Sequence, residues 1–439
     1  MKPKQRTLRV FTSAFAASFK FLILCPLALA ATSSSLFAQS VIREPIPAYP
    51  TALQKEWEAD MKKFGRQHCN YIKSIQNSPN AWEQLDYDGA WVFYQIGDYT
   101  KDSYWYDCAR VANTIYRNWV ISNSGNVAAH WNFGDGLTRA CVTDKDSKSC
   151  DALRLLSSAQ GTYCGDQRPL SVTESSAFSR PVAYCVNTQY LLRTKLGTPK
   201  SQKFDGMAAQ LYWHLRQWFD PNEVKVLACP SEGLFEGERF YFRPFMAALT
   251  LDSLRNVYLL TKNPEILDGF LWSLDRLWNS QKLGVPSITS STPEPLPLKR
   301  MWEPTRKAFF YSDRQVNEPL LDEQVVPDLN LMLAHHYAWA YQMTGDADNV
   351  TRAISLLQGA RSQQKNSSYL HIRKNFFQNY RRSFLLFQLL PRTAIPLKRN
   401  VASSTLTPYP RNVQVRTNSN CQNEPRSPRL VPNDGRDHV

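Results

Sequence analysis

Apolar residues recur at spacings of three and four along most of the chain between about residue 50 and residue 390. One clear case is the run of apolar side chains at Leu329, Met332, Leu333, Ala340 and Met343. This spacing marks one face of an α-helix, whereas strands alternate with a period of two. The pattern therefore predicts an all-α fold.

Many of the predicted helices fall into pairs. Four segments share the order of an aromatic-rich helix, a tight turn and a second helix: residues 86–119, 183–218, 243–278 and 328–360. The first helices are predicted to end at Gly97-Asp98, Gly197-Thr198, Lys262-Asn263 and Gly345-Asp346. Gly or Asn suits a left-handed helix end, and Asp or Thr can cap the next helix. With helices over 51–77, 134–160 and 371–390, the chain predicts five to seven helical hairpins.

A short motif adds a family resemblance to this repeat. The sequence Asp88-Gly89-Ala90-Trp91 opens a predicted helix. It is similar to the Asp-x-Gly-Phe helix opening of the unsaturated glucuronyl hydrolases, with the spacing changed by one residue and Tyr87 in place of the preceding His. The hairpins resemble the six-hairpin (α/α) toroids of glycoside hydrolases and polysaccharide lyases. The resemblance implies a toroid domain over residues 39–390. Residues 284–317 hold too many prolines for a helix, so an irregular proline-rich loop is predicted there.

The net charge of +14 lies mostly at the two ends of the chain. Residues 1–38 hold five basic residues and no acid, and residues 391–439 hold eight basic residues and three acids, which leaves +4 for residues 39–390. This small charge argues against nucleic acid as a partner. The tail over 391–439 is rich in Pro, Arg, Asn and Ser, so it is predicted to be disordered.

The first 38 residues have the pattern of a secretory signal. Basic residues precede a short apolar run over 21–31, and small residues follow it. The run is shorter than the roughly 20 residues of a membrane-spanning helix. Leu24 stands where a lipoprotein signal needs a small residue, so a lipid anchor at Cys25 is disfavoured. We expect a periplasmic or secreted protein with no membrane span.

The cysteines fit an exported protein. Eight remain without Cys25, and an even number in an oxidising compartment predicts disulfides. The predicted bridges are Cys141 to Cys150, Cys164 to Cys185, and Cys69 to Cys108. No C-x-x-C pair is present, so no zinc site is predicted. No cofactor is predicted, although calcium near Asp135 or Asp144 stays open.

The candidate catalytic residues lie where helix starts would converge at one mouth of a toroid. The converging segments are 85–91, 130–136, 173–178, 231–244 and 327–330. The candidate catalytic residues are Asp88, Glu236 and Tyr241. Hydrolysis of a glycosidic bond commonly needs two carboxylates, and the candidate partners of Asp88 are Glu174, Glu236 and Asp328. Tyr241 among arginines would instead suit elimination. The alternative for Asp88 is a helix N-cap.

The candidate substrate-binding residues combine indole rings with polar groups. Pyranose rings stack on indoles, while charged and polar side chains bind hydroxyl and carboxylate groups. These residues are Trp91, His130, Trp131, Glu174, Arg239, Arg243, Trp302, Arg306, Asp328 and His336. Core packing is the alternative for each aromatic residue and for His336. His335 and His336 are adjacent on a helix and should point about 100° apart, so they are not expected to share a metal.

These observations predict an exported enzyme that cleaves glycosidic bonds of a polysaccharide or oligosaccharide, with uronate-containing substrates favoured. Hydrolysis and elimination both stay open. Motifs for nucleotide binding, serine-esterase chemistry and zinc proteolysis are absent from the sequence. The alternative is a non-catalytic exported protein that binds glycan or cell-envelope polymer on the same scaffold.

Overall fold

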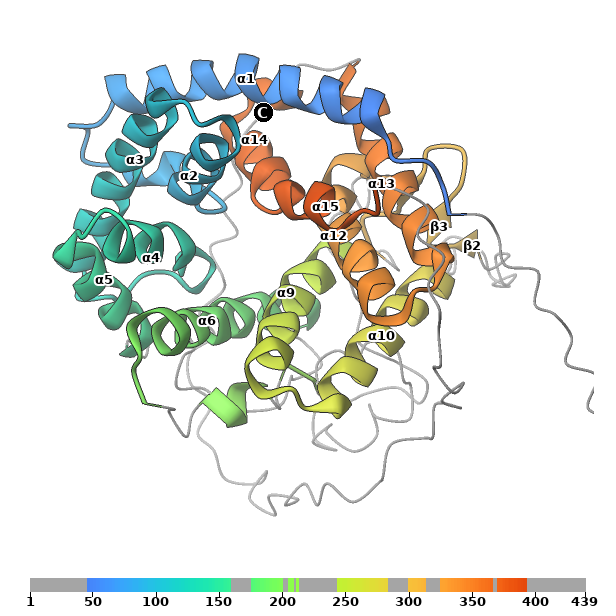
Figure 1. Cartoon of the computed structure of the whole chain (residues 1–439). Coiled ribbons are helices and arrows are strands. Elements are labelled where there is room, and N and C mark those ends of the chain that lie inside the picture. The colour runs from blue at the N-terminus through green and yellow to red at the C-terminus, as the bar shows by residue number, and fades with distance from the viewer. Residues whose placement is uncertain are drawn as a thin grey trace, which may run out of the picture. The chain divides into compact units, whose positions relative to one another are not determined.

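The computed structural model consists mainly of helices that follow one another in pairs (Figure 1). The structure describes residues 46–158, 175–199, 204–208, 211–212, 243–282, 299–312, 324–365 and 369–392. These residues belong to one unit, Glu44–Val439. Their high helix content confirms the all-α prediction. The predicted signal and the predicted tail beyond residue 392 lie outside the described residues.

The helices match the predicted segments closely. The α-helices are α1 (Thr51–Ser74), α2 (Gly89–Thr100), α3 (Ser103–Ser122), α4 (Asp135–Val142), α5 (Ser147–Ser158), α6 (Ser175–Leu196), α9 (Pro244–Thr261), α10 (Pro264–Asn279), α12 (Pro327–Thr344), α13 (Ala347–Lys365), α14 (Arg373–Tyr380) and α15 (Ser383–Leu389). The 3-10 helices are η1 (Ala81–Gln84), η2 (Ala129–Trp131) and η5 (Tyr369–His371). The strands are β1 (Gln281–Lys282), β2 (Lys299–Arg300), β3 (Trp302–Glu303) and β4 (Ala308–Phe309).

Three of the predicted turns end a helix where expected. Gly197 follows α6 with φ 66°, and Gly345 follows α12 with φ 63°. Lys262 takes the same left-handed conformation after α9, with φ 56°. Asn263 then caps α10, because its side chain accepts the N–H of Glu265 at 3.0 Å. The turn chemistry was therefore readable from these residues.

The predicted end of α2 at Gly97 was wrong. This helix continues to Thr100, and Lys101 takes the left-handed conformation with φ 59°. Gly97 lies inside α2 because the ring of Tyr106 packs directly on it. An added Cβ at Gly97 would lie 2.7 Å from that ring. Close helix packing, and not a turn, accounts for this glycine.

Helices that are distant in the sequence pack against one another. Along one series of contacts, α1 packs on α3, α3 on α5, α5 on α6, α6 on α9, α9 on α12, α12 on α13, and α13 on α1 (Figure 1). A second series joins α2 to α4, α4 to α6, α12 to α14 and α15, and α14 to α2. Residues from the first and last thirds of the chain consequently meet in the interior of this unit.

Two disulfides confirm two of the predicted bridges. Cys69 of α1 is bonded to Cys108 of α3, with their Cα atoms 5.4 Å apart. Cys141 of α4 is bonded to Cys150 at the start of α5, with their Cα atoms 4.9 Å apart. The third predicted bridge includes Cys164, which lies outside the described residues. Such bonds are typical of proteins in oxidising compartments.

None of the described helices has an apolar stretch of the length needed to cross a bilayer.

Part of the proline-rich segment forms small antiparallel strand pairs. Strand β1 pairs with β2, and β3 pairs with β4. The ring of Trp302 lies 4.2 Å from that of Trp278 on α10. Gly359 of α13 lies so close to the carbonyl of Lys307 that an added Cβ would be 2.2 Å from it. Residues 299–312 are thus packed onto α10 and α13.

Candidate functional site

Asp88 begins α2 in an unusual backbone conformation. Tyr87 and Asp88 both have left-handed φ angles, 53° and 65°. For residues other than glycine this conformation costs about 1–2 kcal/mol each. It lets the Asp88 carboxylate accept the N–H of Trp91 at 3.1 Å and the N–H of Gly136 at 3.0 Å. Strain at a buried acid is a common sign of a functional position.

Gly136 is what allows α4 to approach Asp88. A Cβ at this position would lie 2.6 Å from the Asp88 carboxylate and 3.0 Å from the Cβ of Ala90. The predicted mouth segments 85–91 and 130–136 therefore do meet, with the start of α2 against the start of α4. The residue before Gly136 is Asp135, so this approach brings a second carboxylate beside Asp88.

Asp135 is surrounded by donor groups from α6 and from the turn between α14 and α15. Its Oδ2 accepts Nη2 of Arg382 at 3.0 Å and Nδ2 of Asn187 at 3.1 Å. Nη2 of Arg381 lies 3.7 Å from the same oxygen. Asn187 is itself oriented by Asn256, whose Nδ2 donates to its Oδ1 at 2.7 Å. These donors all bind the ionised form of a carboxylate best.

Arg382 joins Asp135 to a second buried acid. Its Nε lies 3.4 Å from Oδ2 of Asp252 on α9. The other Asp252 oxygen lies 2.8 Å from Nε2 of His335 on α12. We call Asp88, Asp135, Asp252, His335, Arg381 and Arg382 the central charged cluster.

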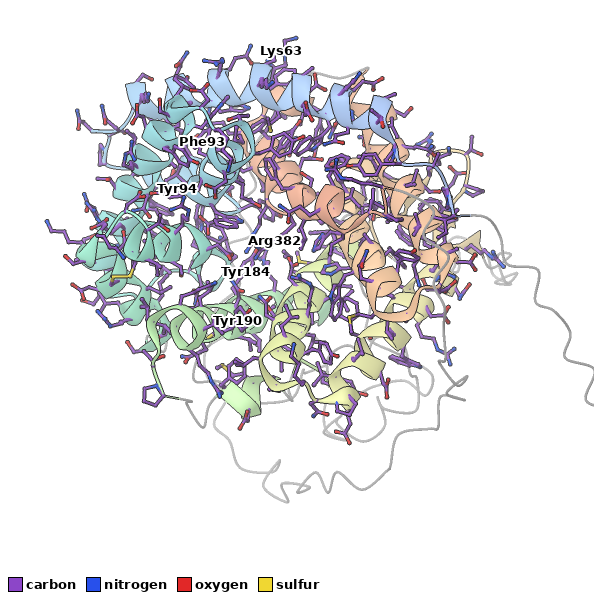
Figure 2. All side chains as sticks on the ribbon, viewed as in Figure 1. Lys63, Phe93, Tyr94, Tyr184, Tyr190 and Arg382 are labelled. Carbon is purple, nitrogen blue, oxygen red and sulfur yellow. A yellow bond between two sulfur atoms is a disulfide. The ribbon has the colours of Figure 1, made fainter. Side chains whose placement is uncertain are left out.

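The central charged cluster is largely removed from water. Asp88 is 3% exposed and His335 is 1% exposed. The Arg382 side chain retains 15% of its accessible surface. Figure 2 shows Arg382 with Tyr184 in the interior, between the helices that carry the cluster, and Nη1 of Arg381 donates to the Tyr184 hydroxyl at 3.3 Å. In such surroundings charges interact more strongly than in water.

Burial sets the protonation of Asp88. Burial and the negative charge of Asp135 together raise the pKa of this carboxyl to about 6. The N–H groups of Gly136 and Trp91 and the guanidinium of Arg381 act in the opposite direction. Asp88 is thus an acid that can hold or release a proton near neutral pH.

The pKa values of Asp252 and the two histidines are shifted in the opposite direction to that of Asp88: all three are lowered. Burial acts to raise the pKa of Asp252, but Arg382 and His335 outweigh it and hold that pKa well below its usual range. Burial lowers the pKa of His335, although Asp252 acts to raise it. Burial lowers the pKa of His336 strongly, and His335 adds to the effect. These groups form an ionised acid beside two neutral imidazoles at neutral pH.

The two histidines also correct a prediction about metals. Asp252, His335 and His336 each offer one ligand atom, and these atoms lie within 4.8 Å of one another. The imidazoles were expected to diverge, yet their ring centres are 3.9 Å apart. Both Nε2 atoms turn toward Asp252, at 2.8 and 3.7 Å from Oδ1. Side-chain rotation therefore overrides the 100° between neighbouring helix positions.

The carboxylates considered for calcium have other partners. Asp135 faces Arg382 and Arg381, as described above. Asp144 accepts the Tyr94 hydroxyl at 2.6 Å and lies 3.8 Å from Nη1 of Arg139. Cations and donors already face both groups, so neither is assigned to a metal.

The predicted stacking residues are packed to different degrees. Trp131 lies among Trp82, Trp119 and Phe133, with its ring 5.1 Å from that of Trp82. Trp302 packs on Trp278, as noted above. Trp91 is half-buried against the core, and its indole N–H has no hydrogen-bond partner among the described residues. Of the three rings, Trp91 is the one attached to the Asp88 site.

The predicted polar residues lie at several places. The guanidinium of Arg243 is 4.6 Å from the ring of Tyr311, and both are buried. Asp328 accepts the hydroxyl of Tyr369 and is buried at the start of α12. Both predicted residues are therefore packed against a tyrosine side chain.

Of the remaining polar candidates, three have their own surroundings in the structure and four lie outside the described residues. His336 donates through Nε2 to the carbonyl of Ala248 at 2.9 Å. His130 is exposed, and the exposed residue Arg306 uses its backbone N–H to bind Glu303 at 2.6 Å. Four candidates lie outside the described residues: Glu174, Glu236, Arg239 and Tyr241. Among the described carboxylates, Asp135 is the one whose charge acts on Asp88, whereas the predicted Asp328 binds the Tyr369 hydroxyl.

Sequence reasoning missed most of the central charged cluster. Arg381 and Arg382 follow the apolar pair Phe376-Phe377 and precede Phe384, and Asp252 stands in the apolar helix α9. Charges inside apolar runs are a signal of buried ion pairs, since such residues are rarely buried without a partner. That signal was present, but it does not say which acid meets which base.

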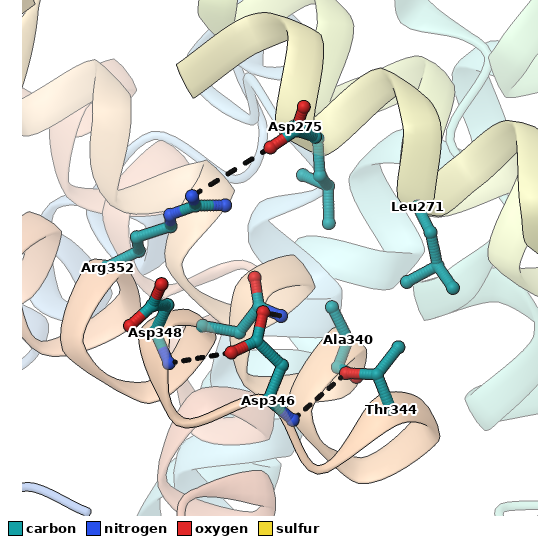
Figure 3. A pocket seen from close by; sticks show the side chains of 9 residues that line it. Leu271, Asp275, Ala340, Thr344, Asp346, Asp348 and Arg352 are labelled. Carbon is teal, nitrogen blue, oxygen red and sulfur yellow. Dashed lines mark hydrogen bonds and ion pairs between the residues drawn. The ribbon is translucent and has the colours of Figure 1, made fainter. Parts of the chain in front are cut away.

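A separate hollow of about 290 Å³ lies between α10, α12 and α13 (Figure 3). Its lining includes Asp275, Asp346 and Asp348, and Nη2 of Arg352 lies 3.9 Å from the Asp275 carboxylate. Asp346 accepts the N–H of Asp348 at 3.1 Å, which is a helix cap. These polar groups serve local structure, and no member of the central charged cluster lines this hollow.

Comparisons of the chain with protein-family models, curated proteins and solved structures found no match.

Proposed function

We propose that this protein is an exported carbohydrate-active enzyme that hydrolyses glycosidic bonds with Asp88 and Asp135. The observation that supports this is a buried carboxyl of pKa about 6 beside a carboxylate that is bound by Arg382 and Asn187. Glycosidic hydrolysis uses one carboxylic acid and one carboxylate with different roles. Two acids whose surroundings differ in this way meet that requirement.

In the proposed reaction, Asp88 donates its proton to the glycosidic oxygen that leaves. The negative charge that remains on Asp88 is received by the N–H groups of Trp91 and Gly136, which already point at its two oxygens. Such preorganised donors stabilise charge as it develops. Asp135 activates water or attacks the sugar carbon, and both roles need the ionised form. Elimination would instead need a proton-transfer residue such as Tyr241, which lies outside the described residues.

The proposal includes the toroid and export. Successive helices contact one another from α1 through α3, α5, α6, α9, α12 and α13 back to α1, and this series of contacts supports a closed ring of hairpins. The meeting of the starts of α2 and α4 supports a site at one mouth of that ring. The disulfides Cys69–Cys108 and Cys141–Cys150 support a location outside the reducing cytoplasm.

A non-catalytic glycan-binding protein is the second candidate. The observation that favours it is that Asp88 caps α2 through the N–H of Trp91 and is only 3% exposed. A purely structural acid could make the same hydrogen bonds. In that case the pair of carboxylates would join α2 to α4 without any turnover.

The decisive experiment compares Asp88→Asn and Asp135→Asn with the wild-type chain on a panel of neutral and acidic glycans, by release of reducing ends. Loss of a positioned acid or base typically slows turnover about 10²- to 10⁴-fold. The control is Asp151→Asn, since Asp151 lies on the surface of α5 with a side chain 64% exposed. The wild-type rate should fall as pH rises through about 6, because Asp88 must be protonated to donate. Glycan binding without turnover by the wild-type chain would reject the enzyme and support the second candidate.

A further inference from the structure

Three ligating side chains converge where α9 packs against α12. Asp252 of α9 and the adjacent residues His335 and His336 of α12 each offer one ligand atom, and these atoms lie within 4.8 Å of one another. Nε2 of His335 is 2.8 Å from Oδ1 of Asp252, and Nε2 of His336 is 3.7 Å from the same oxygen. Ligands at the usual zinc distances of about 2.0–2.2 Å lie roughly 3–4 Å from one another. Small rotations of these side chains therefore suffice to place them around one ion.

The convergence depends on α9 as well as on α12. Neighbouring positions of a helix point about 100° apart, so the two imidazoles meet because both side chains rotate toward Asp252. The carbonyl of Ala248, one turn earlier on α9, lies 2.9 Å from Nε2 of His336 and adds a second oxygen. Two imidazole nitrogens with oxygen ligands suit zinc, whereas calcium and magnesium prefer oxygen ligands alone. The ligand set therefore favours a transition metal.

The protonation states of the three side chains are those of metal ligands. A metal binds neutral imidazoles and ionised carboxylates, because a proton would occupy the lone pair that the metal needs. Burial lowers the pKa of both histidines. Burial acts to raise the pKa of Asp252, but Arg382 and His335 hold it well below its usual range. No imidazolium or carboxylic acid therefore has to lose a proton at neutral pH before an ion binds.

Arg382 acts on this group through the second oxygen of Asp252. Its Nε lies 3.4 Å from Oδ2, whereas the imidazoles face Oδ1. Ligating carboxylates normally have such outer partners, which fix their orientation. The positive charge of Arg382 also opposes a bound cation. In addition, metal binding moves the ring protons to the Nδ1 atoms, which have no hydrogen-bond partner among the described residues. Missing outer partners typically cost 10- to 100-fold in metal affinity, so we expect a moderate affinity.

We propose that Asp252, His335 and His336 bind one zinc ion that joins α9 to α12. The ion replaces the hydrogen bonds that the two Nε2 atoms make to Asp252 and to the carbonyl of Ala248. The imidazoles are 1% and 0% exposed, so the ion stabilises the contact between two helices and does not receive a substrate. The zinc site uses neither Asp88 nor Asp135, and it does not depend on the proposed function.

The test measures zinc binding by isothermal titration on the full chain after dialysis against a chelator. We expect one zinc ion per chain, with a Kd of about 1 µM or tighter, and much weaker binding of calcium. His336→Gln should weaken zinc binding at least about tenfold, since it removes a ligand but keeps a donor for the Ala248 carbonyl. His371→Gln is the matched control, because His371 is exposed on η5, and it should leave zinc binding unchanged. Zinc should raise the Tm of the wild-type chain and of the control, but not that of His336→Gln.

X-ray absorption on the zinc-loaded wild-type chain identifies the ligands even if a variant does not fold. We expect nitrogen and oxygen ligands at about 2.0–2.2 Å, with scattering from two imidazoles. A sulfur ligand or a single imidazole would overturn the site. So would a folded wild-type chain that binds no zinc, or unchanged zinc binding in a His336→Gln protein with a native circular dichroism spectrum. Zinc binding without glycan turnover would leave the site standing and reject the enzyme, and turnover without zinc binding would do the reverse.

Discussion

Two buried regions of the molecule consist of different types of residue. One is the region where α1 packs against α3 and α14, and the other is the central charged cluster. In the first region, the rings of Trp57, Trp105 and Phe376 are almost fully buried, and Cys69–Cys108 joins α1 to α3. Several of its buried polar groups have neutral partners. Nε1 of Trp57, for example, donates to Oγ of Ser383 at 3.1 Å.

The central charged cluster instead holds several formal charges where apolar side chains would pack well. Asp135, Asp252, Arg381 and Arg382 are all buried or nearly so, and Asp88 adds backbone strain. Buried ion pairs contribute little net stability compared with apolar packing of the same volume. The aromatic rings and the disulfide between α1 and α3 therefore contribute to stability. The central charged cluster contributes little net stability by comparison. This difference supports the proposal that the central charged cluster is the functional part of the molecule.

The largest expected effect on stability follows from breaking the cluster at its centre. Arg382→Met removes the cation that bridges Asp135 and Asp252, and leaves two buried carboxylates with fewer partners. We expect the free energy of unfolding to fall by about 3–5 kcal/mol, measured by urea denaturation. Arg66→Met is the matched control, because Arg66 and its partner Asp102 are 53% and 40% exposed, and it should lose at most about 1 kcal/mol. Equal losses in the two variants would contradict the contrast between the regions.

A slightly smaller effect is expected from opening the α1–α3 region. The double variant Cys69→Ala/Cys108→Ala removes a bond that closes a loop of 39 residues. We expect a loss of about 2–4 kcal/mol in unfolding free energy under oxidising conditions. Removal of Cys141–Cys150, which closes only 9 residues, should have an effect about 1 kcal/mol smaller. A reducing agent should abolish both differences, and a difference that persists would show that packing and not the bond is responsible.

The smallest effect concerns a neutral buried base in the α1–α3 region. Burial lowers the pKa of His68 to about 4, while its Nε2 donates to the carbonyl of Leu370 at 2.8 Å. The unfolded chain takes up a proton near pH 6.5 and the folded chain does not, so stability falls as pH drops from 6.5 toward 4. Between pH 7 and pH 5 we expect His68 to account for about 2 kcal/mol of this loss.

His68→Gln isolates that contribution, because glutamine keeps a donor for Leu370 and cannot titrate in this range. Unfolding free energies of the variant and the wild-type chain are compared at pH 7 and pH 5. The wild-type chain should lose more stability on acidification, and the remaining loss in the variant belongs to other groups such as His335 and His336. An identical pH dependence in both proteins would show that His68 is already protonated in the folded state.

The helices and most of their ends were predictable, whereas the cluster was not. Spacings of three and four marked each long helix, and Gly197, Lys262 and Gly345 ended helices where expected. Gly97 was misread because a glycine selected for contact with Tyr106 looks the same in sequence as one selected for a turn. Asp88 was identified through its short motif, but its partner was expected at Glu174, Glu236 or Asp328.

The sequence by itself determined the all-α fold, the pairing of helices and two disulfides, because these depend on periodicity and short-range spacing. Only the tertiary structure decided that Asp88 meets Asp135 and that Arg382 bridges Asp135 and Asp252. Asp135 and Arg382 are 247 residues apart, and many other pairings of acids and arginines have the same local pattern. The packing of α15 against α12 and of α14 against α2 and α12 selects one of them. Burial then shifts the pKa values of these side chains, and burial is set by the tertiary structure and not by the local sequence.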